Sequence, residues 1–172
     1  IEPMSNAPVT VSNSVAASSG PTPDPTTATV AIFGASGDLT ARKLLPALYD
    51  LWSDGYLSDV APIVGVARKE KSDESFRNEI YEAINGHVRS GAVPVDQWNQ
   101  FARRLFYRQL DIASPDGYPG FREQLETIED HQGTHGNRVF YMATSPDLFL
   151  PAVEHLGFGG LIPSRDAPEW LR

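Results

Sequence analysis

An apolar run near the start of the chain passes directly into a glycine-rich loop. Residues 29–33 read Thr-Val-Ala-Ile-Phe, and Gly34-Ala35-Ser36-Gly37-Asp38 follows at once. Short β-branched and aromatic runs of this kind form strands that are buried on both faces of a parallel sheet. Glycines let the backbone turn tightly, and a helix that starts there directs its N–H groups and positive dipole end at an anion. The junction therefore predicts a strand, a phosphate-binding turn and a helix.

The loop departs from the two standard phosphate-binding patterns. In the dinucleotide pattern G-x-G-x-x-G, Ser36 occupies the place of the second glycine and Leu39 that of the third. The Gly-Lys-Ser/Thr ending of a P-loop is also missing. Spacing alone is therefore a weak signal, and a tight turn without a ligand remains an alternative interpretation.

The rest of the chain alternates apolar runs with stretches of helical periodicity. Further strands are predicted at residues 62–67, 106–110 and 138–144, with helices between them. Pro46 lies inside the first helical stretch and predicts a kink or two short pieces. A second helix is predicted between Ser72, a suitable N-cap, and Gly91. This alternation predicts an α/β fold: a Rossmann-like, doubly wound, mainly parallel sheet with helices on both faces.

Three cations follow the second predicted strand: Arg68, Lys69 and Lys71. At this position a dinucleotide-binding domain places an acid on the ribose of NAD, or a cation on the 2′-phosphate of NADP. The cluster is a local reversal in a chain of net charge −8. Together with the glycine loop it favours NADP as the cofactor. The alternative is an ordinary solvated loop.

Two further side chains are candidates for a ligand site. Tyr141 lies near the carboxyl end of the fourth predicted strand, where ligands of doubly wound sheets bind. Its alternative role is that of a core aromatic residue. Lys43 follows the glycine loop by about one helical turn and is placed to reach a substrate phosphate. Its alternative role is that of a solvated surface lysine.

Composition excludes several classes of protein. The net charge of −8 and the pI near 4.9 have the wrong sign for nucleic-acid phosphates or an anionic membrane. No cysteine is present, so disulfides, a thiolate nucleophile and cysteine-ligated metals are excluded. The four histidines lie away from the predicted crevice, and no metal-ligand spacing stands out. The sequence therefore predicts no catalytic residue and no metal site.

Residues 1–28 differ in composition from the rest of the chain. They contain nine Ser or Thr, five prolines and no aromatic residue, which predicts a disordered tail. Residues 29–172 are then expected to form one binding domain. The chain begins with Ile1 and its last segment reads as unfinished, so a fragment of a longer protein is expected.

Three segments of the chain together resemble one known family. The run from Gly34 to Leu48, which includes Arg42, Lys43 and Pro46, closely resembles the amino-terminal domain of glucose-6-phosphate dehydrogenase. Residues 63–68 and 137–143 resemble the same family, so the resemblance spans about residues 29–163. The family's next segments are absent here: a Glu-Lys-Pro-Phe-Gly strand and an Arg-Ile-Asp-His-Tyr helix with the catalytic base.

The resemblance implies an NADP-binding domain that is truncated at its carboxyl end. It implies that Arg68 faces the adenosine 2′-phosphate and that Tyr141 lines the nicotinamide side, while Lys43 remains the candidate for substrate binding. The pyrophosphate would be cradled by the loop, whose residues are Gly34, Ala35, Ser36, Gly37, Asp38, Leu39, Thr40 and Ala41.

For the parent protein the resemblance implies a cytoplasmic, homo-oligomeric enzyme. Such an enzyme oxidises glucose 6-phosphate to 6-phosphoglucono-1,5-lactone in the oxidative pentose phosphate pathway and passes hydride to NADP. The 172 residues alone are expected to be inactive, because the segments with the base are absent. The alternative from a different class is a stand-alone NADP-binding or redox-sensing module without catalysis.

Overall fold

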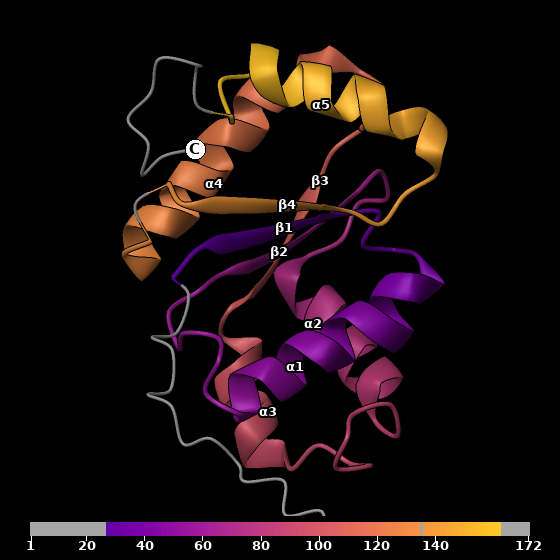
Figure 1. Cartoon of the computed structure of the whole chain (residues 1–172), viewed down its shortest axis with the longest axis vertical. Coiled ribbons are helices and arrows are strands. Elements are labelled where there is room, and N and C mark those ends of the chain that lie inside the picture. Colours follow the sequence, from indigo (N-terminus) through magenta and orange to yellow (C-terminus); the bar gives the residue numbers. More distant parts are fainter. Residues whose placement is uncertain (1–26, 135, 163–172) are drawn as a thin grey trace, which may run out of the picture.

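A four-stranded parallel sheet forms the centre of the molecule (Figure 1). The structure is a computed structural model that describes residues 27–134 and 136–162, so the predicted tail lies almost wholly outside the described residues. The strands are β1 (Thr29–Phe33), β2 (Ile63–Ala67), β3 (Leu105–Gln109) and β4 (Arg138–Met142). They lie in the order β3-β2-β1-β4, and all three pairings are parallel.

Helical segments connect the strands. Between β1 and β2 the chain forms η1 (Thr40–Leu44) and α1 (Leu45–Ser53), and between β2 and β3 it forms α2 (Asp73–Ile84) and α3 (Val95–Ala102). Before β4 come η2 (Pro115–Gly117) and α4 (Tyr118–Gln132), and after it come η3 (Pro146–Leu148) and α5 (Phe149–Phe158).

The strand order reverses direction next to β1. The chain moves outward from β1 to β2 and β3, and then returns to the other side of β1 for β4. In open parallel sheets, ligands bind beyond the carboxyl ends of the strands at such a reversal. The predicted Rossmann-like, doubly wound fold is thereby confirmed, and its crevice lies between the ends of β1 and β4.

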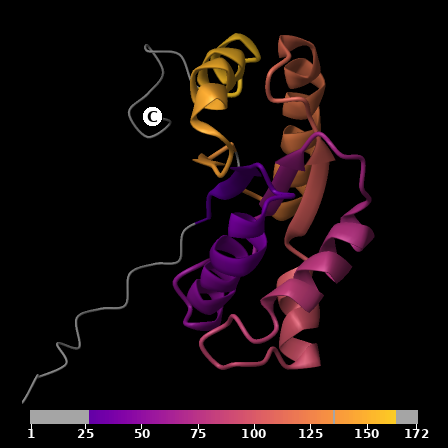
Figure 2. The ribbon, with the colours of Figure 1, turned by 90° about the vertical axis from the view of Figure 1, so that its right-hand side faces the viewer.

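Two apolar cores enclose the sheet, one on each face. Figures 1 and 2 show α1, α2 and α3 on one side and α4 and α5 on the other. Because successive strand residues point to opposite faces, Ile32 packs in the first core and Phe33 in the second. Burying a side chain such as Phe33 contributes about 1.5–3 kcal/mol. β2 lies between the cores and is buried along its whole length, as its continuous apolar run requires.

Local sequence signals set most helix ends. Ser72 caps α2, because its hydroxyl accepts a hydrogen bond from the N–H of Ser75 at 3.0 Å. The helical run after the glycine loop has two pieces, the π-helical η1 and then α1, as the position of Pro46 predicts. Pro46 lies in the first turn of α1, where no N–H is needed.

The expectation that the second helix extends to Gly91 is wrong. α2 ends at Ile84, and Gly86 follows with a φ of +85°. The side chain of Asn85 explains the early end, since its amide donates to the carbonyl of Tyr81 at 2.8 Å and its oxygen accepts from the N–H of Val93 at 3.1 Å. These contacts turn the chain back toward α3. No helix in the described part of the chain combines the length and apolar character that a membrane crossing requires.

Candidate functional site

Gly34 lies where the ends of β1 and β4 touch. Its φ is +94°, and a Cβ added to it would lie 2.2 Å from the carbonyl oxygen of Ala143. The two segments are held together, because the N–H of Ala143 donates to the carbonyl of Phe33 at 2.8 Å. Only glycine has both the conformation and the space for this closure at the strand-order reversal.

Backbone hydrogen bonds fold the loop after Gly34 back on itself. The carbonyl of Val66 accepts from the N–H groups of Gly34 at 2.8 Å and Ala35 at 3.0 Å. The carbonyl of Gly34 accepts from the N–H of Gly37 at 3.0 Å and from the hydroxyl of Thr40 at 3.3 Å. The loop therefore has a fixed shape that depends on contacts within about six residues and on β2.

The residues of the loop divide into an inner and an outer set. Ala35 and Thr40 are buried under the loop, whereas Ser36, Asp38 and Leu39 are exposed. Among the predicted cofactor contacts, the exposed residues are accessible to a ligand, whereas the buried residues shape the turn. These assignments remain predictions.

The helical run behind the loop begins with an exposed ion pair. The Nε of Arg42 lies 2.8 Å from a carboxylate oxygen of Asp38, and both side chains are more than half exposed. Such a pair contributes less than about 1 kcal/mol. Asp38 thus pairs with Arg42 one helical turn further along the chain. The first turn of the run keeps the unpaired N–H groups and partial positive charge that attract an anion.

A cleft of about 820 Å³ opens beyond the carboxyl ends of the strands. This volume is typical of small-molecule sites. Gly34 and Ser36 line it from the glycine loop, and Arg68 and Lys69 line it from the loop after β2. Thr144, which the sequence places at the carboxyl end of the fourth strand, also lines the cleft, as does Ala67. The rest of the wall is made by residues that sequence reasoning missed: Asp111, Ile112 and Ala113 after β3, and Ser145, Asp147 and Leu148 after β4. The rule that ligands bind at carboxyl ends of parallel strands was the available signal for them.

The three cations after β2 have different partners. Lys71 forms an ion pair with Glu79, its side chain is only 7% exposed, and its ammonium lies 5.7 Å from the centre of the Tyr107 ring. Arg68 and Lys69 are exposed and form none of the ion pairs found among the described residues. Two of the three cations are therefore free to meet a phosphate in the cleft.

The loop after β3 is supported from below by a buried tyrosine. The hydroxyl of Tyr118 donates to the carbonyl of Ile112 at 3.0 Å, and Tyr118 is 1% exposed. Burial, with a smaller effect of Asp111, raises the pKa of Tyr118 to about 12. A ring nitrogen of His155 lies 3.3 Å from the same carbonyl. His155 thus contacts the outside of the cleft wall, and no histidine of the described residues lines the cleft.

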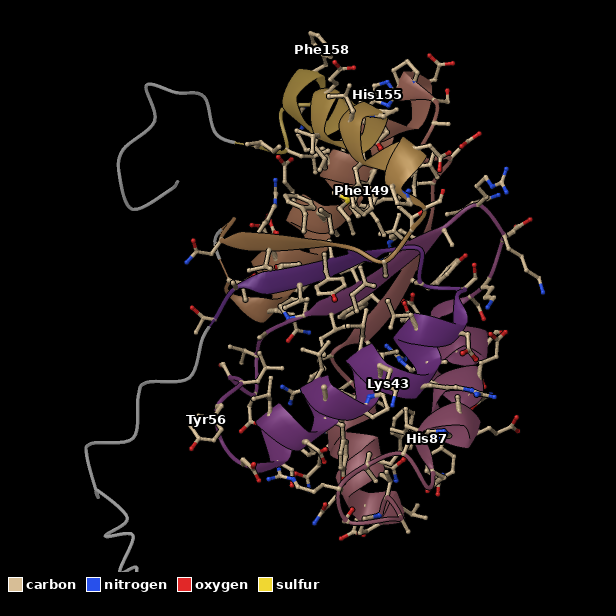
Figure 3. All side chains as sticks on the ribbon, turned by 45° about the vertical axis from the view of Figure 1, so that its right-hand side comes forward. Lys43, Tyr56, His87, Phe149, His155 and Phe158 are labelled. Carbon is tan, nitrogen blue, oxygen red and sulfur yellow. The ribbon has the colours of Figure 1, made fainter. Side chains whose placement is uncertain are left out.

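Tyr141 and Lys43 lie outside the cleft lining. Tyr141 pairs with Ile32 in the sheet and lines a separate hollow of about 120 Å³, together with Leu44 and Leu48. It is 44% exposed. Lys43 lies on η1, below the sheet in Figure 3, and its side chain is exposed. The roles expected for these two residues remain predictions.

The comparisons with known proteins agree with this geometry. A family model described as glucose-6-phosphate dehydrogenase, NAD binding domain, matches residues 31–172. The chain belongs to the glucose-6-phosphate dehydrogenase family. The resemblance seen in the sequence is thus confirmed, and the matched range includes both the glycine loop and the cleft.

The curated relatives match this chain over about a quarter of their own length. The glucose-6-phosphate 1-dehydrogenase of Chlamydia muridarum is 44% identical over 125 residues, which are 73% of this chain and 25% of that protein. The enzyme of Chlamydia pneumoniae is 46% identical over 125 residues. The chain therefore spans about a quarter of the length of the curated relatives that it matches.

Solved structures of the family share the fold. A glucose-6-phosphate dehydrogenase in complex with glucose 6-phosphate superposes with a TM-score of 0.71 at 28% identity, over 84% of this chain and 29% of that one. The enzyme from Mycobacterium avium gives a TM-score of 0.67 at 26% identity, over 80% and 28% of the two chains. The fold of the described residues is therefore that of the family.

Proposed function

We propose that this chain is the NADP-binding part of an enzyme that oxidises glucose 6-phosphate to 6-phosphoglucono-1,5-lactone. The observation that carries the proposal is that one cleft is lined by the glycine loop after β1 and by Arg68 after β2. A diphosphate and a third phosphate are thus offered separate positive sites in a single cavity. Membership of the family supports the substrate.

The residues present fit NADP. The N–H groups of Gly34, Ala35 and Gly37 hold the turn in its shape, and the positive start of the helical run behind the turn is the part that attracts a diphosphate. Residues 34–41 are assigned to that contact. Arg68 is assigned to the 2′-phosphate, because its guanidinium is exposed beside the cleft and forms no ion pair among the described residues. A guanidinium matches the geometry of a phosphate with two parallel hydrogen bonds.

The chain's own residues bind and orient, whereas the cofactor supplies a nicotinamide ring that accepts hydride. Tyr141 is assigned to the nicotinamide side and Lys43 to the phosphate of the sugar. We assign no base for the proton of the sugar hydroxyl to the described residues, because the family's base belongs to a segment that the resemblance does not find in this chain. We therefore propose that residues 1–172 alone bind NADP without turnover.

Calorimetric titration tests the binding part of the proposal. The 172-residue chain is titrated with NADP and, separately, with NAD. The expected result is saturable heat with both and tighter binding of NADP. No heat and no shift in melting temperature at millimolar NADP would contradict the proposal.

A chimeric enzyme tests the catalytic part. Residues 29–172 replace the matching quarter of the Chlamydia muridarum enzyme, and formation of reduced NADP is followed on addition of glucose 6-phosphate. Activity that depends on this sugar phosphate is expected. A chimera that folds and binds NADP without oxidising the sugar would favour the second candidate, a non-catalytic NADP-binding module.

The remaining assignments concern the parent protein. We propose a homo-oligomeric enzyme of the cytoplasm that needs neither nucleic acid nor a membrane, with residues 1–28 as a tail and residues 29–172 as the binding domain. Support comes from the net charge of −8, which opposes binding to polyanions. Light scattering of the active chimera tests the oligomeric state.

A further inference from the structure

The loop that carries Arg68 is bound along its backbone by side chains of the neighbouring strand. Residues 68–72 connect β2 to α2, and residues 68–70 are exposed. Nevertheless, the carbonyls of Ala67, Arg68 and Lys69 each accept a hydrogen bond from β3 or the residue after it. The bond to Ala67, the last residue of β2, continues the sheet, whereas the carbonyls of Arg68 and Lys69 belong to the exposed loop and are held by side chains of β3.

Tyr107 of β3 holds the middle of this loop from inside the core. Its hydroxyl donates to the carbonyl of Lys69 and lies 3.3 Å from that of Ala67, and the residue is 2% exposed. Burial, with a smaller effect of Glu79, raises the pKa of Tyr107. The hydroxyl therefore keeps its proton at neutral pH and can act as the donor.

Gln109, the last residue of β3, holds the carbonyl of Arg68 itself. It pairs with Ala67 in the sheet, so its side chain lies beside the first residue of the loop. The amide Nε2 donates to the Arg68 carbonyl at 2.9 Å. Gln109 is exposed and lines a smaller hollow next to the cleft together with Arg68. Neither hydrophobic packing nor burial requires an amide at this position.

The far end of the loop is attached to the same strand. A carboxylate oxygen of Asp73, the first residue of α2, accepts from the N–H of Tyr107 at 2.6 Å and from Arg108 at 2.9 Å. Both ends of the loop are thus fixed to β3, while the side chains of Arg68 and Lys69 stay exposed. A pre-ordered loop loses less conformational entropy when a ligand binds.

We propose that Tyr107 and Gln109 are positioning residues that set the preference for NADP over NAD, by holding the backbone that aims Arg68 at the 2′-phosphate. This inference rests on the proposed function, because it takes Arg68 as the phosphate contact. Neither residue touches the cofactor. Their effect is on the loop and is confined to the cofactor that carries the additional phosphate.

Single substitutions test the inference by calorimetric titration of the 172-residue chain with NADP and NAD. Gln109→Leu removes the donor and keeps the size of the side chain, and Tyr107→Phe removes one hydroxyl. Each is expected to weaken the binding of NADP by about 3- to 10-fold, which is the range for one net hydrogen bond. The affinity for NAD is expected to change less than twofold. The matched controls are Gln100→Leu, an exposed glutamine of α3, and Tyr49→Phe, a buried tyrosine that donates to Gln97. Both controls should leave the affinity ratio unchanged.

A double-mutant cycle separates positioning from a general structural role. In the Arg68→Ala background, Gln109→Leu should no longer change NADP affinity, because the side chain that it aims is gone. Equal losses for both cofactors, or an undiminished loss without Arg68, would overturn the inference. Since Gln109 is exposed, its variant keeps the test decisive even if Tyr107→Phe fails to fold.

The two proposals fail in different ways. If wild-type protein binds NADP no tighter than NAD, or Arg68→Ala leaves their ratio unchanged, the assignment of the 2′-phosphate to Arg68 is wrong. If Arg68→Ala lowers the ratio while Gln109→Leu and Tyr107→Phe leave it unchanged, the proposed function stands and the positioning role is wrong.

Discussion

The two loops that bring positive charge to the cleft are built in opposite ways. The loop after β1 takes its shape from bonds among Gly34, Gly37 and Thr40, which are within six residues of one another. The loop after β2 is held by Tyr107 and Gln109, which lie 38 and 41 residues from the carbonyls that they bind. The first loop therefore combines bonds within six residues with backbone hydrogen bonds from Gly34 and Ala35 to Val66 of β2, whereas the second is held by side chains of β3.

This difference separates the residues that bind both cofactors from those that set the preference for NADP over NAD. A turn fixed by its own glycines offers a diphosphate site that serves NAD and NADP alike. In a loop that is held by distant side chains, substitutions in β3 can change the position of Arg68, while the diphosphate site stays intact. Damage to the first loop should therefore affect fold and both cofactors, and damage to the second should affect their ratio.

The largest effect is expected from Gly34→Ala. A Cβ would lie 2.2 Å from the Ala143 carbonyl oxygen at a φ of +94°, so strain and overpacking together should cost about 3–5 kcal/mol of unfolding free energy. Urea unfolding measures the loss. The control is Gly55→Ala, at a φ of +79° with nothing within 4 Å of the added Cβ, which should cost about 1–2 kcal/mol. Equal losses would show that β1 and β4 do not close tightly on Gly34.

The next effect concerns the loop after β3, which is supported by the buried Tyr118, six residues from the carbonyl of Ile112 that it binds. Tyr118 has a pKa of about 12 in the folded chain and 10.0 as its ordinary value. Below pH 10 both states are neutral; above it the unfolded state loses its proton first, so stability falls between pH 10 and 12. The loss should approach about 2–3 kcal/mol. The difference in unfolding free energy between wild type and Tyr118→Phe isolates it, and a difference independent of pH in this window would contradict the prediction.

Gly37→Val separates the diphosphate site from the fold. A Cβ at Gly37 would lie 3.2 Å from the carbonyl oxygen of Gly34, a contact that a small adjustment relieves. The branched side chain would instead fill space needed by the diphosphate. We expect the affinities for NADP and for NAD to fall together by at least about tenfold, while the circular dichroism spectrum of the protein stays unchanged. Selective loss of NADP alone would argue against the division between the two loops.

The smallest effect is expected from Lys71→Met. Lys71 is paired with Glu79 and its side chain is 7% exposed, so it is committed to holding α2 against the loop. Its loss should change the ratio of NADP to NAD affinity by less than about twofold, because selectivity rests on other residues. A large fall of the ratio on titration would place Lys71 at the phosphate.

The same contrast explains what the sequence could predict. The alternation of strands and helices, the glycine turn after β1 and the helix cap at Ser72 follow from neighbouring residues, so patterns along the chain reveal them. The pairing of Lys71 with Glu79, the end of α2 at Asn85 and the cleft wall at residues 111–113 depend on packing between elements. The sequence alone does not distinguish the roles of Arg68, Lys69 and Lys71. Only the residues that contact each side chain in the structure separate Arg68 and Lys69 from Lys71.

The affinity ratio of NADP to NAD in wild type and Arg68→Ala tests the central claim most directly. One charge-assisted contact to the 2′-phosphate contributes about 1.5–3 kcal/mol, so the ratio measured by calorimetric titration should fall about 10- to 150-fold, with NAD affinity nearly unchanged. A ratio that is the same in both proteins, or an equal loss for both cofactors, would contradict the account.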